Sequence, residues 1–411
     1  MTPPQASAPP SDRAPPLIYL IAGEASGDVL GARLIAALRA RRPDLRFAGI
    51  GGTAMAAEGF ASLFPMRELA LMGLLEILPQ LRALRRRLAE TLADIAARRP
   101  AVVVTIDSPG FTLRVLRAIA PLGIKRAHYV APQAWAWRES RVRHYPGLWD
   151  RLLCLLPFEP AFFARHDLPA LFVGHPVLES GADAGDAARF RARHGLASDA
   201  RILIVMPGSR RTETTRLLPI LGAALRLLAA EAPGLIPVVP LAGPVSESVR
   251  AATAAWPIKP ILIDDPAEKF DAFAAAAAAL TKSGTSTLEL GLAGVPMVVT
   301  YRVNPLSAAI ARRLVKVRFA ALINLLAGRE VVPELIQQAC TPARIATALG
   351  RLLADPAAAA AQRADMRAAL ETLRPPAGRP SDAAAAAVLA LLDAAARENV
   401  MPARSASPAP V

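Results

Sequence analysis

Short apolar, β-prone runs alternate with segments of helical spacing from residue 17 onward. Loops that contain Gly, Ser or Asp separate many of these runs from the segments that follow them. Such alternation is typical of β-α-β units, in which helices join parallel strands. The pattern therefore predicts an α/β fold of doubly wound parallel sheets, in which ligands bind beyond the carboxyl ends of the strands.

The expected elements form two series. In the first, we expect helices at 29–41, 81–99 and 111–120, and strands at 17–22, 45–50, 101–106, 126–130, 151–155 and 170–173. In the second, we expect strands at 201–206, 236–241, 261–263, 277–281 and 297–301. We therefore predict two Rossmann-like domains, 17–180 and 198–340, facing each other across a cleft. Residues 341–400 are expected to be helical, and 1–16 and 401–411 to be disordered.

Composition narrows the possible partners. The 411 residues suffice for two α/β domains, and an apolar fraction of 53% supplies two cores. A formal net charge of +14 indicates anionic partners: phosphorylated ligands, nucleic acid or an anionic membrane. Alternatively, the positive charge reflects an overall Arg-rich composition and does not indicate a binding site. Cys154 and Cys340, the two cysteines, form neither a disulfide framework nor a zinc site, which fits a reducing compartment. No apolar run reaches 18 residues, so we expect no membrane span.

The loop 282–287 is the most informative stretch. It lies between an expected strand and an expected helix and comprises Lys282, Ser283, Gly284, Thr285, Ser286 and Thr287. Backbone N–H groups and hydroxyls in such a place suit a phosphate, and Glu289 further on can accept hydrogen bonds from a ribose. A loop that binds nothing is the alternative. No Walker or dinucleotide-binding glycine string occurs, which argues against P-loop NTPases and dinucleotide oxidoreductases.

Two further loops follow strands. The first contains Gly23, Ser26, Gly27 and Asp28, where Ser26 and Asp28 could cap the next helix or the backbone N–H groups could hold an acceptor or a phosphate. The second contains Gly208, Ser209 and Arg210 followed by Arg211. Guanidinium groups match phosphate oxygens bidentately, so this second loop suits a diphosphate.

Asp107 ends the expected strand 101–106 and is a candidate general base, with helix capping as the alternative. Judged alone, a histidine such as His175 is more often structural than catalytic. Trp135 and Trp137 either line a sugar or acyl site or pack in the core. The histidines are scattered and no D-x-D string occurs, so a metal site is not indicated.

The segment 69–81 is strongly apolar and is followed by a basic cluster. Its apolar members Leu71, Met72, Leu74 and Leu75, with Arg82, Arg85, Arg86 and Arg87, could settle on an anionic bilayer. A core helix with a solvated basic continuation is the alternative.

Taken together, these strings resemble the lipid A disaccharide synthase family. The resemblance runs in family order from about Leu17 to Gln338, and includes IAGEASGDVLGARLI (21–35), ALMGLLEIL (70–78), IDSPGF (106–111), HYVAPQAWAWRESR (128–141), MPGSRRTE (206–213), TKSGTSTLELGLAGVPMVVTY (281–301) and NLLAGREVVPELIQ (324–337). A match of this length is far more specific than any one motif.

The resemblance implies a GT-B glycosyltransferase of Gram-negative bacteria. Its implied partners are UDP-2,3-diacylglucosamine as donor, 2,3-diacylglucosamine 1-phosphate as acceptor and the anionic inner face of the inner membrane, where it is a peripheral cytoplasmic protein. The products are a β-1,6 disaccharide and UDP. The implied enzyme is inverting and needs neither metal nor cofactor, and nucleic acid is not expected. Asp107, Arg210 and Asn324 match positions on which the family depends, and 283–289 matches its UDP site.

One departure concerns the loop after Asp107. The family's loop usually carries a second Asp and an Asn where this chain has Gly110 and Thr112. A UDP-sugar 2-epimerase and a catalytically silent nucleotide-sugar-binding protein are therefore the alternatives.

Overall fold

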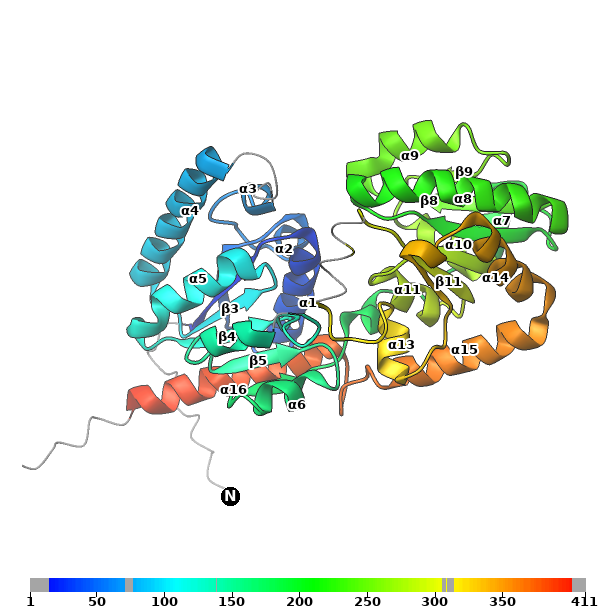
Figure 1. Ribbon diagram of the computed structural model, residues 1–411. Coiled ribbons are helices and arrows are strands. Elements are labelled where there is room, and N and C mark those ends of the chain that lie inside the picture. Colours follow the sequence, from blue (N-terminus) through cyan, green and yellow to red (C-terminus); the bar gives the residue numbers. More distant parts are fainter. Residues whose placement is uncertain (1–14, 71–76, 138, 305–307, 309–313, 401–411) are drawn as a thin grey trace, which may run out of the picture. The chain divides into compact units, whose positions relative to one another are not determined.

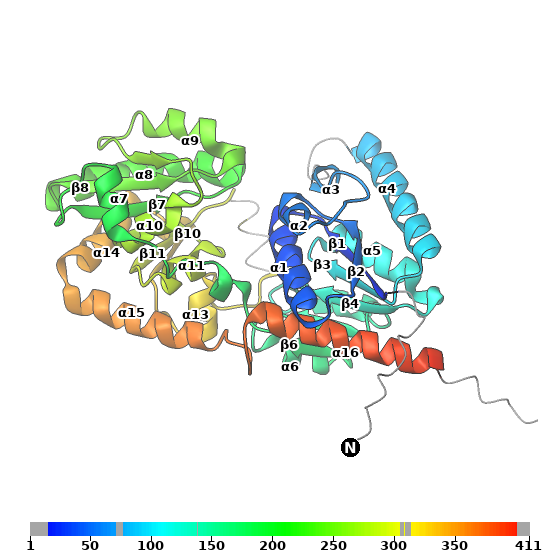
Figure 2. The same ribbon diagram turned by 180° about the vertical axis from the view of Figure 1, so that it is seen from behind.

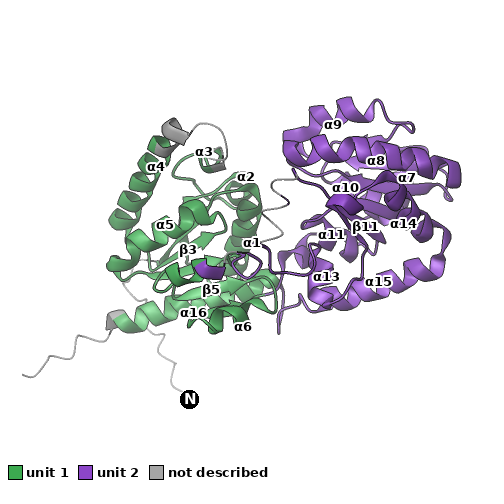
Figure 3. Cartoon of the chain, in the orientation of Figure 1, with its two compact units in different colours: residues 1–132, 141–173, 380–411 green, residues 133–140, 174–379 purple. Residues whose placement is uncertain are grey.

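The computed structural model describes residues 15–70, 77–137, 139–304, 308 and 314–400. The chain forms two compact units (Figure 3). Unit 1 comprises residues 1–132, 141–173 and 380–411, and unit 2 comprises 133–140 and 174–379. Within the described ranges, no helix is both long and apolar enough to cross a membrane.

The sheet of unit 1 has six parallel strands in the order β2-β1-β3-β4-β5-β6. These strands are β1 (Leu17–Ala22), β2 (Arg46–Ile50), β3 (Val102–Ile106), β4 (Lys125–Tyr129), β5 (Arg151–Cys154) and β6 (Ala170–Phe172). Each expected strand of the first series is present, with ends that differ by at most one residue. Their β-branched and aliphatic runs are buried on both sides, as expected for a parallel sheet covered by helices.

Alternate side chains of each strand enter different cores. Ile18 and Leu20 pack with α1 (Ala25–Arg41) and α16 (Pro380–Val400) on one face. Tyr19 packs on the other face. That second face is covered by α4 (Ile77–Arg98) and α5 (Pro109–Ile119). Figures 1 and 2 show α1 with α16 beside one face and α4 with α5 beside the opposite face. The shorter helices are α2 (Thr53–Ala57), α3 (Arg67–Ala70) and α6 (Glu159–Ala164).

The sheet of unit 2 is also parallel, in the order β12-β11-β10-β7-β8-β9. Its strands are β7 (Arg201–Met206), β8 (Leu235–Pro240), β9 (Ile261–Ile263), β10 (Ala276–Lys282), β11 (Met297–Tyr301) and β12 (Glu334–Ile336). Its helices are α7 (Ala187–Arg193), α8 (Arg211–Glu231), α9 (Ser246–Thr253), α10 (Glu268–Ala274), α11 (Ser286–Leu292), α13 (Leu322–Ala327), α14 (Pro342–Ala354) and α15 (Pro356–Glu371). The core formed with α8, α9 and α14 contains Leu203, Val205 and Leu280.

The domain limits differ from those expected in three respects. Unit 2 begins at Gly174 rather than after residue 180, and the expected linker contains α7. Residues 133–140 belong to unit 2 although their neighbours in the chain belong to unit 1. The last helix, α16, returns to unit 1, because its small apolar side chains, Ala384 and Val388 among them, complete the core beside α1.

Candidate active site

The four loops singled out in the sequence lie at equivalent places in the two sheets. In unit 1, β1 and β3 are neighbours, and the chain progresses from them in opposite directions. In unit 2, β7 and β10 stand in the same relation. Parallel sheets bind ligands at such switch points, beyond the carboxyl ends of the strands. The loops after β1 and β3 are therefore one half-site, and those after β7 and β10 are the other.

The backbone of the first half-site is strained. Asp107 and Ser108 directly follow β3 with φ of 51° and 46°, and Val130 follows β4 with φ of 78°. Left-handed backbone at such residues persists where the surroundings impose it, and it is enriched at functional sites. The Asp107 N–H donates to Tyr129 O at 2.9 Å, and the Thr112 hydroxyl donates to Asp107 O at 2.7 Å. Thr112 thus fixes the turn that presents Asp107.

The Asp107 carboxyl group is largely removed from water. Burial raises the pKa of Asp107, and the Ser108 N–H partly opposes this by donating a hydrogen bond to the carboxylate. A Cβ on Gly23 would lie 2.5 Å from Ser108 Oγ, so a glycine is required for this close approach of the two loops. A Cβ on Gly110 would meet nothing within 4 Å in the described structure. Packing therefore does not demand glycine at the position where the family usually has its second carboxylate.

For the loop after β1, the structure contradicts one of the two alternatives, the capping of the next helix by Asp28. Helix α1 begins at Ala25, and its N-cap Glu24 makes no side-chain cap bond. Asp28 is buried and accepts hydrogen bonds from the N–H groups of Gly52, Ala54 and Met55 at 2.7–3.0 Å. The expectation that Asp28 caps α1 is therefore wrong: its carboxylate caps α2.

The two remaining residues of this loop differ in exposure. Ser26 lies exposed in the first turn of α1. Gly27 is buried against β3, where an added Cβ would lie 3.4 Å from Ile106 O. Gly27 therefore allows α1 to approach β3.

The second half-site is built around a buried carboxylate. Glu213 Oε1 accepts from Lys282 Nζ at 3.1 Å and from Arg210 at 3.4 Å. Only 5% of the Glu213 side chain is exposed, and its Oε2 is buried without a hydrogen-bond partner in the described structure. Gly208 has a φ of 116°, and a Cβ there would lie 2.7 Å from Glu213 Oε2. Glycine is therefore required beside this carboxylate, which holds two cations at the switch point.

Much of the hydrogen-bonding capacity of loop 282–287 is used within the protein. Ser283 Oγ donates to Ala320 O at 2.7 Å, and Thr287 Oγ1 donates to Gly284 O at 2.8 Å. Ser286 Oγ shares a 3.2 Å hydrogen bond with Thr281 Oγ1. Thr285 is exposed, and Gly284 has a φ of 156°. Ser209 also belongs to this half-site, in the bend after Gly208.

Glu289 lies in the first turn of α11 and has a cationic partner. Both of its carboxylate oxygens accept from Lys269 Nζ at 3.0 Å. The Lys269 ammonium also lies 4.6 Å from the centroid of the Phe270 ring. This pair holds Glu289 in one orientation, one turn beyond the loop that carries Lys282.

Asn324 is fully buried in α13, and its amide group is fully used. Its Nδ2 donates to Val332 O and to Glu334 Oε1 at 2.8 Å, and its Oδ1 accepts from the N–H groups of Val331 and Val332. In the described structure, these bonds leave no atom of the Asn324 amide free to contact a substrate. Its observed contacts hold the segment between α13 and β12.

The proposed membrane segment is only partly described. Leu71, Met72, Leu74 and Leu75 lie outside the described residues. Arg82, Arg85 and Arg86 are exposed on α4.

Arg87 differs from its three neighbours. It donates to Glu68 and to Glu90, and its guanidinium lies 4.5 Å from the centroid of the Phe64 ring. The inclusion of Arg87 in a membrane-docking cluster is therefore not supported: its partners tie α4 to α3 and to the core beneath.

His175 has a structural role, as expected. It is buried, and its Nδ1 accepts from the Val177 N–H at 3.1 Å. Burial lowers the pKa of His175 to about 4, so the imidazole is neutral near pH 7.

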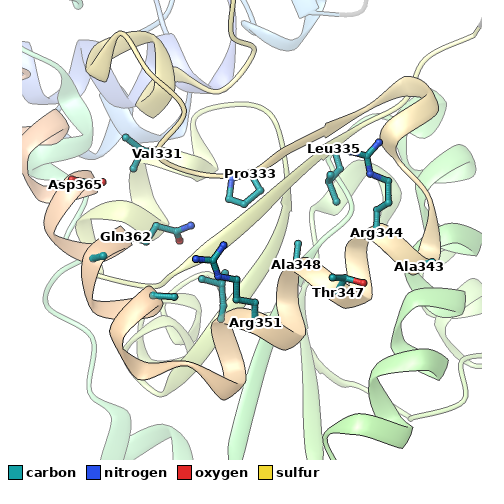
Figure 4. Close-up of a pocket in the computed structure, with 13 residues that line it drawn as sticks. Val331, Pro333, Leu335, Ala343, Arg344, Thr347, Ala348, Arg351, Gln362 and Asp365 are labelled. Carbon is teal, nitrogen blue, oxygen red and sulfur yellow. The ribbon is translucent and has the colours of Figure 1, made fainter.

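A cavity of about 600 Å³ lies elsewhere in unit 2, between α14, α15 and β12. Figure 4 shows Arg344 and Arg351 on one side of it and Gln362 and Asp365 on the other. Asp365 pairs with Arg329, and Gln362 Oε1 accepts from the Met297 N–H. None of the predicted site residues lines this cavity.

Glu213 and Lys269 are functional candidates that the sequence did not predict, although the position of Glu213 in the sequence is informative. Glu213 lies on the buried stripe of α8 with Leu217 and Leu221, and a charged residue on an apolar stripe indicates a buried partner. Lys269, the partner of Glu289, gave no comparable signal.

Comparison with known proteins agrees with this architecture. The family model described as lipid-A-disaccharide synthetase matches residues 18–388. The lipid-A-disaccharide synthase of Granulibacter bethesdensis is 60% identical over 388 residues, covering 92% of this chain and 99% of that protein. That of Gluconobacter oxydans is 56% identical over 395 residues, covering 95% of each.

Solved structures of other enzymes share the fold. The UDP-GlcNAc 2-epimerase from Neisseria meningitidis bound to UDP-GlcNAc has a TM-score of 0.60 at 12% identity, covering 92% of this chain and 100% of that one. The calicheamicin glycosyltransferase CalG4 has a TM-score of 0.57 at 19% identity, covering 93% and 99%. At these identities the likeness shows the fold alone, which is GT-B. Because the family model spans nearly the whole chain and both relatives match more than nine-tenths of it, the chain belongs to the lipid-A-disaccharide synthetase family.

Proposed function

We propose that this protein transfers 2,3-diacylglucosamine from its UDP donor to 2,3-diacylglucosamine 1-phosphate, forming a β-1,6 disaccharide and UDP. The observation that carries this proposal is the family match over residues 18–388. The two half-sites supply the chemistry that the reaction needs: a carboxylate of raised pKa in unit 1 and a pair of cations in unit 2.

The proposed step is a single displacement with inversion. The 6-hydroxyl oxygen of the acceptor forms a bond to the anomeric carbon of the donor, while the bond from that carbon to the UDP oxygen breaks. Asp107 takes the proton of the hydroxyl group as the bond forms. Burial favours this role, because a carboxylate whose pKa is raised holds the proton more strongly.

Arg210 and Lys282 provide positive charge for the departing diphosphate. In the described structure both pair with Glu213, and 75% of the Arg210 side chain is exposed and able to turn toward a ligand. The N-terminus of the 21-residue helix α8, directly after Arg210, adds favourable potential. These groups could replace a metal ion, and among the described residues no His, Cys, Asp and Glu side chains cluster in a metal-binding arrangement.

The remaining site residues take supporting roles. Glu289 is placed for the ribose, and Gly208, Ser209 and the loop 282–287 for the diphosphate. Gly23, Ser26 and Gly27 are proposed for the acceptor side. Asn324 acts as a positioning residue through the segment 331–334.

We further propose that the protein works as a peripheral protein on the cytoplasmic face of the inner membrane. Both substrates carry acyl chains that leave water for a bilayer. The proposed contact consists of Leu71, Met72, Leu74 and Leu75 together with the exposed Arg82, Arg85 and Arg86 on α4. Changing these three arginines to Ser should lower binding to anionic vesicles without changing affinity for UDP.

The test is a transfer assay with purified protein, labelled donor and acceptor. Formation of the disaccharide together with UDP supports the proposal. Conversion of a UDP-sugar to its 2-epimer without acceptor would indicate the alternative enzyme that shares this fold. Binding of the donor without any product would indicate a nucleotide-sugar-binding protein.

A further inference from the structure

The exposed apolar side chains of this protein are not evenly spread. Seven large hydrophobic residues are exposed in the described structure, and three of them, Trp137, Leu314 and Val315, lie in one place in unit 2. Their exposed fractions are 38%, 37% and 44%. Single exposed hydrophobic residues need no explanation, whereas a contiguous group of them is a candidate interaction surface.

A short backbone pairing brings these three residues together from distant parts of the chain. Trp137 and Val315 form an isolated antiparallel bridge. The Lys316 N–H donates to Ala136 O at 3.0 Å. Residues 133–140 are the segment whose chain neighbours belong to unit 1. The fold therefore holds an otherwise separate segment against 314–316, and this pairing presents Trp137 at the surface.

Cations flank this group. Lys316 pairs with Glu139 at 2.6 Å, and 63% of the Lys316 side chain remains exposed. Arg318 is exposed, and its guanidinium lies 5.2 Å from the centroid of the Phe319 ring. An indole beside aliphatic side chains and basic groups matches the interface of a bilayer, where Trp is enriched and anionic headgroups attract Lys and Arg.

We propose that Trp137, Leu314 and Val315, with Lys316 and Arg318, form a bilayer-contact surface on unit 2 whose partner is an anionic lipid surface. We call it the Trp137 surface. It is separate from the segment around α4 in unit 1, and its choice of partner rests on the proposed function, in which both substrates are lipids.

The direct test uses the fluorescence of the four tryptophans. Trp149 and Trp256 are buried and Trp135 is half-buried, which leaves Trp137 as the exposed indole. Vesicles of phosphatidylglycerol and phosphatidylethanolamine that contain brominated lipid should quench the parent protein. The W137F variant should lose most of this quenching, whereas W135F should keep it. Equal quenching of the parent and W137F would overturn the proposal.

Binding strength gives a second readout. The triple variant Trp137→Ser, Leu314→Ser, Val315→Ser should bind the same vesicles about fivefold or more weakly, because the apolar contact that inserts is removed. The matched control is Leu122→Ser with Leu227→Ser, which removes two exposed side chains from other places and should bind like the parent. UDP calorimetry on each variant checks that the fold is intact.

Two further outcomes contradict the proposal. The first is sedimentation of the triple variant with vesicles to the same extent as the parent. The second is self-association of the parent in the absence of lipid while the triple variant stays monomeric, which would make this surface an interface between copies of the chain. Loss of vesicle binding without loss of disaccharide synthesis from detergent-dispersed substrates supports the proposal. Intact vesicle binding without any synthesis would refute the proposed function and leave the Trp137 surface standing.

Discussion

The two half-sites occupy the same place in their sheets and have opposite chemistry. At the β1–β3 switch point the chain presents Asp107 on left-handed backbone, and burial raises the pKa of its carboxyl group. At the β7–β10 switch point, glycine turns surround a buried carboxylate, Glu213, that pairs with Lys282 and Arg210.

In both units the sheet topology sets the location of these loops, whereas the side chains set their chemistry. In each unit, the loops after the two central strands lie at the carboxyl ends of those strands, where parallel sheets bind ligands. A desolvated carboxylate there accepts a proton, whereas paired cations there hold an anion. Under the proposed function, one unit would move a proton and the other would hold the leaving group.

Asp107→Asn should produce the largest effect. It removes the proton acceptor while keeping the shape of the side chain, so turnover should fall about a hundredfold or more. UDP affinity should stay unchanged, because the nucleotide is proposed to bind at the other half-site. Steady-state kinetics and calorimetry on the same preparation check both statements, and near-normal turnover in a folded variant would remove Asp107 from this role.

The pH profile sharpens this assignment. The base acts only when deprotonated, so kcat/KM should rise with pH through the pKa of Asp107 and then level off. Because burial raises that pKa, the rise should lie above the ordinary range of an aspartate. A rise that persists unchanged in the residual activity of Asp107→Asn would belong to another group.

Gly208→Ala should strain the second half-site. The φ of 116° disfavours alanine, and its Cβ would lie 2.7 Å from Glu213 Oε2. We expect the free energy of unfolding to fall by about 2 kcal/mol. Gly234→Ala is the control, since Gly234 also has positive φ, 76°, but an open environment. Equal losses in urea denaturation would show that the contact with Glu213 contributes nothing.

Glu289→Ala should weaken UDP binding about tenfold, or about 1.4 kcal/mol, since the carboxylate is proposed to bind the ribose. Lys269→Met keeps Glu289 and removes only its partner, so its effect should be smaller. Calorimetry with UDP compares the two. If Lys269→Met weakens binding as much as Glu289→Ala, the ion pair rather than the ribose contact governs affinity.

Excess chelator should have the smallest effect, because we expect it to leave the initial rate of the reaction unchanged. Arg210 and Lys282 are proposed to supply the charge that a divalent cation supplies in other transferases. Initial rates measured with and without EDTA should agree. Loss of activity that magnesium restores would show that the cations of the second half-site are insufficient.

The strands and the strand-end loops followed from the sequence because they depend on local pattern. Buried parallel strands are continuous apolar runs, and β7, β9 and β11 have the bounds expected for them. β12 escaped because its three residues begin with Glu334, and no apolar run marks it. Asp107 could be located because it directly follows a recognisable strand, and Arg210 because it lies in the short loop after one.

Partners and packing were decided by the tertiary structure. The sequence could not show that Asp28 caps α2 or that the Asn324 side chain hydrogen-bonds to the backbone of 331–332. Nor could it show that Glu213 accepts a hydrogen bond from Lys282, which lies 69 residues away in the chain. It could not assign α16 to unit 1 either, because a helix with a small apolar face can cover either sheet. Local spacing determines which element forms. Which side chains then meet depends on burial and charge pairing between distant segments, and these exist only once the chain has folded.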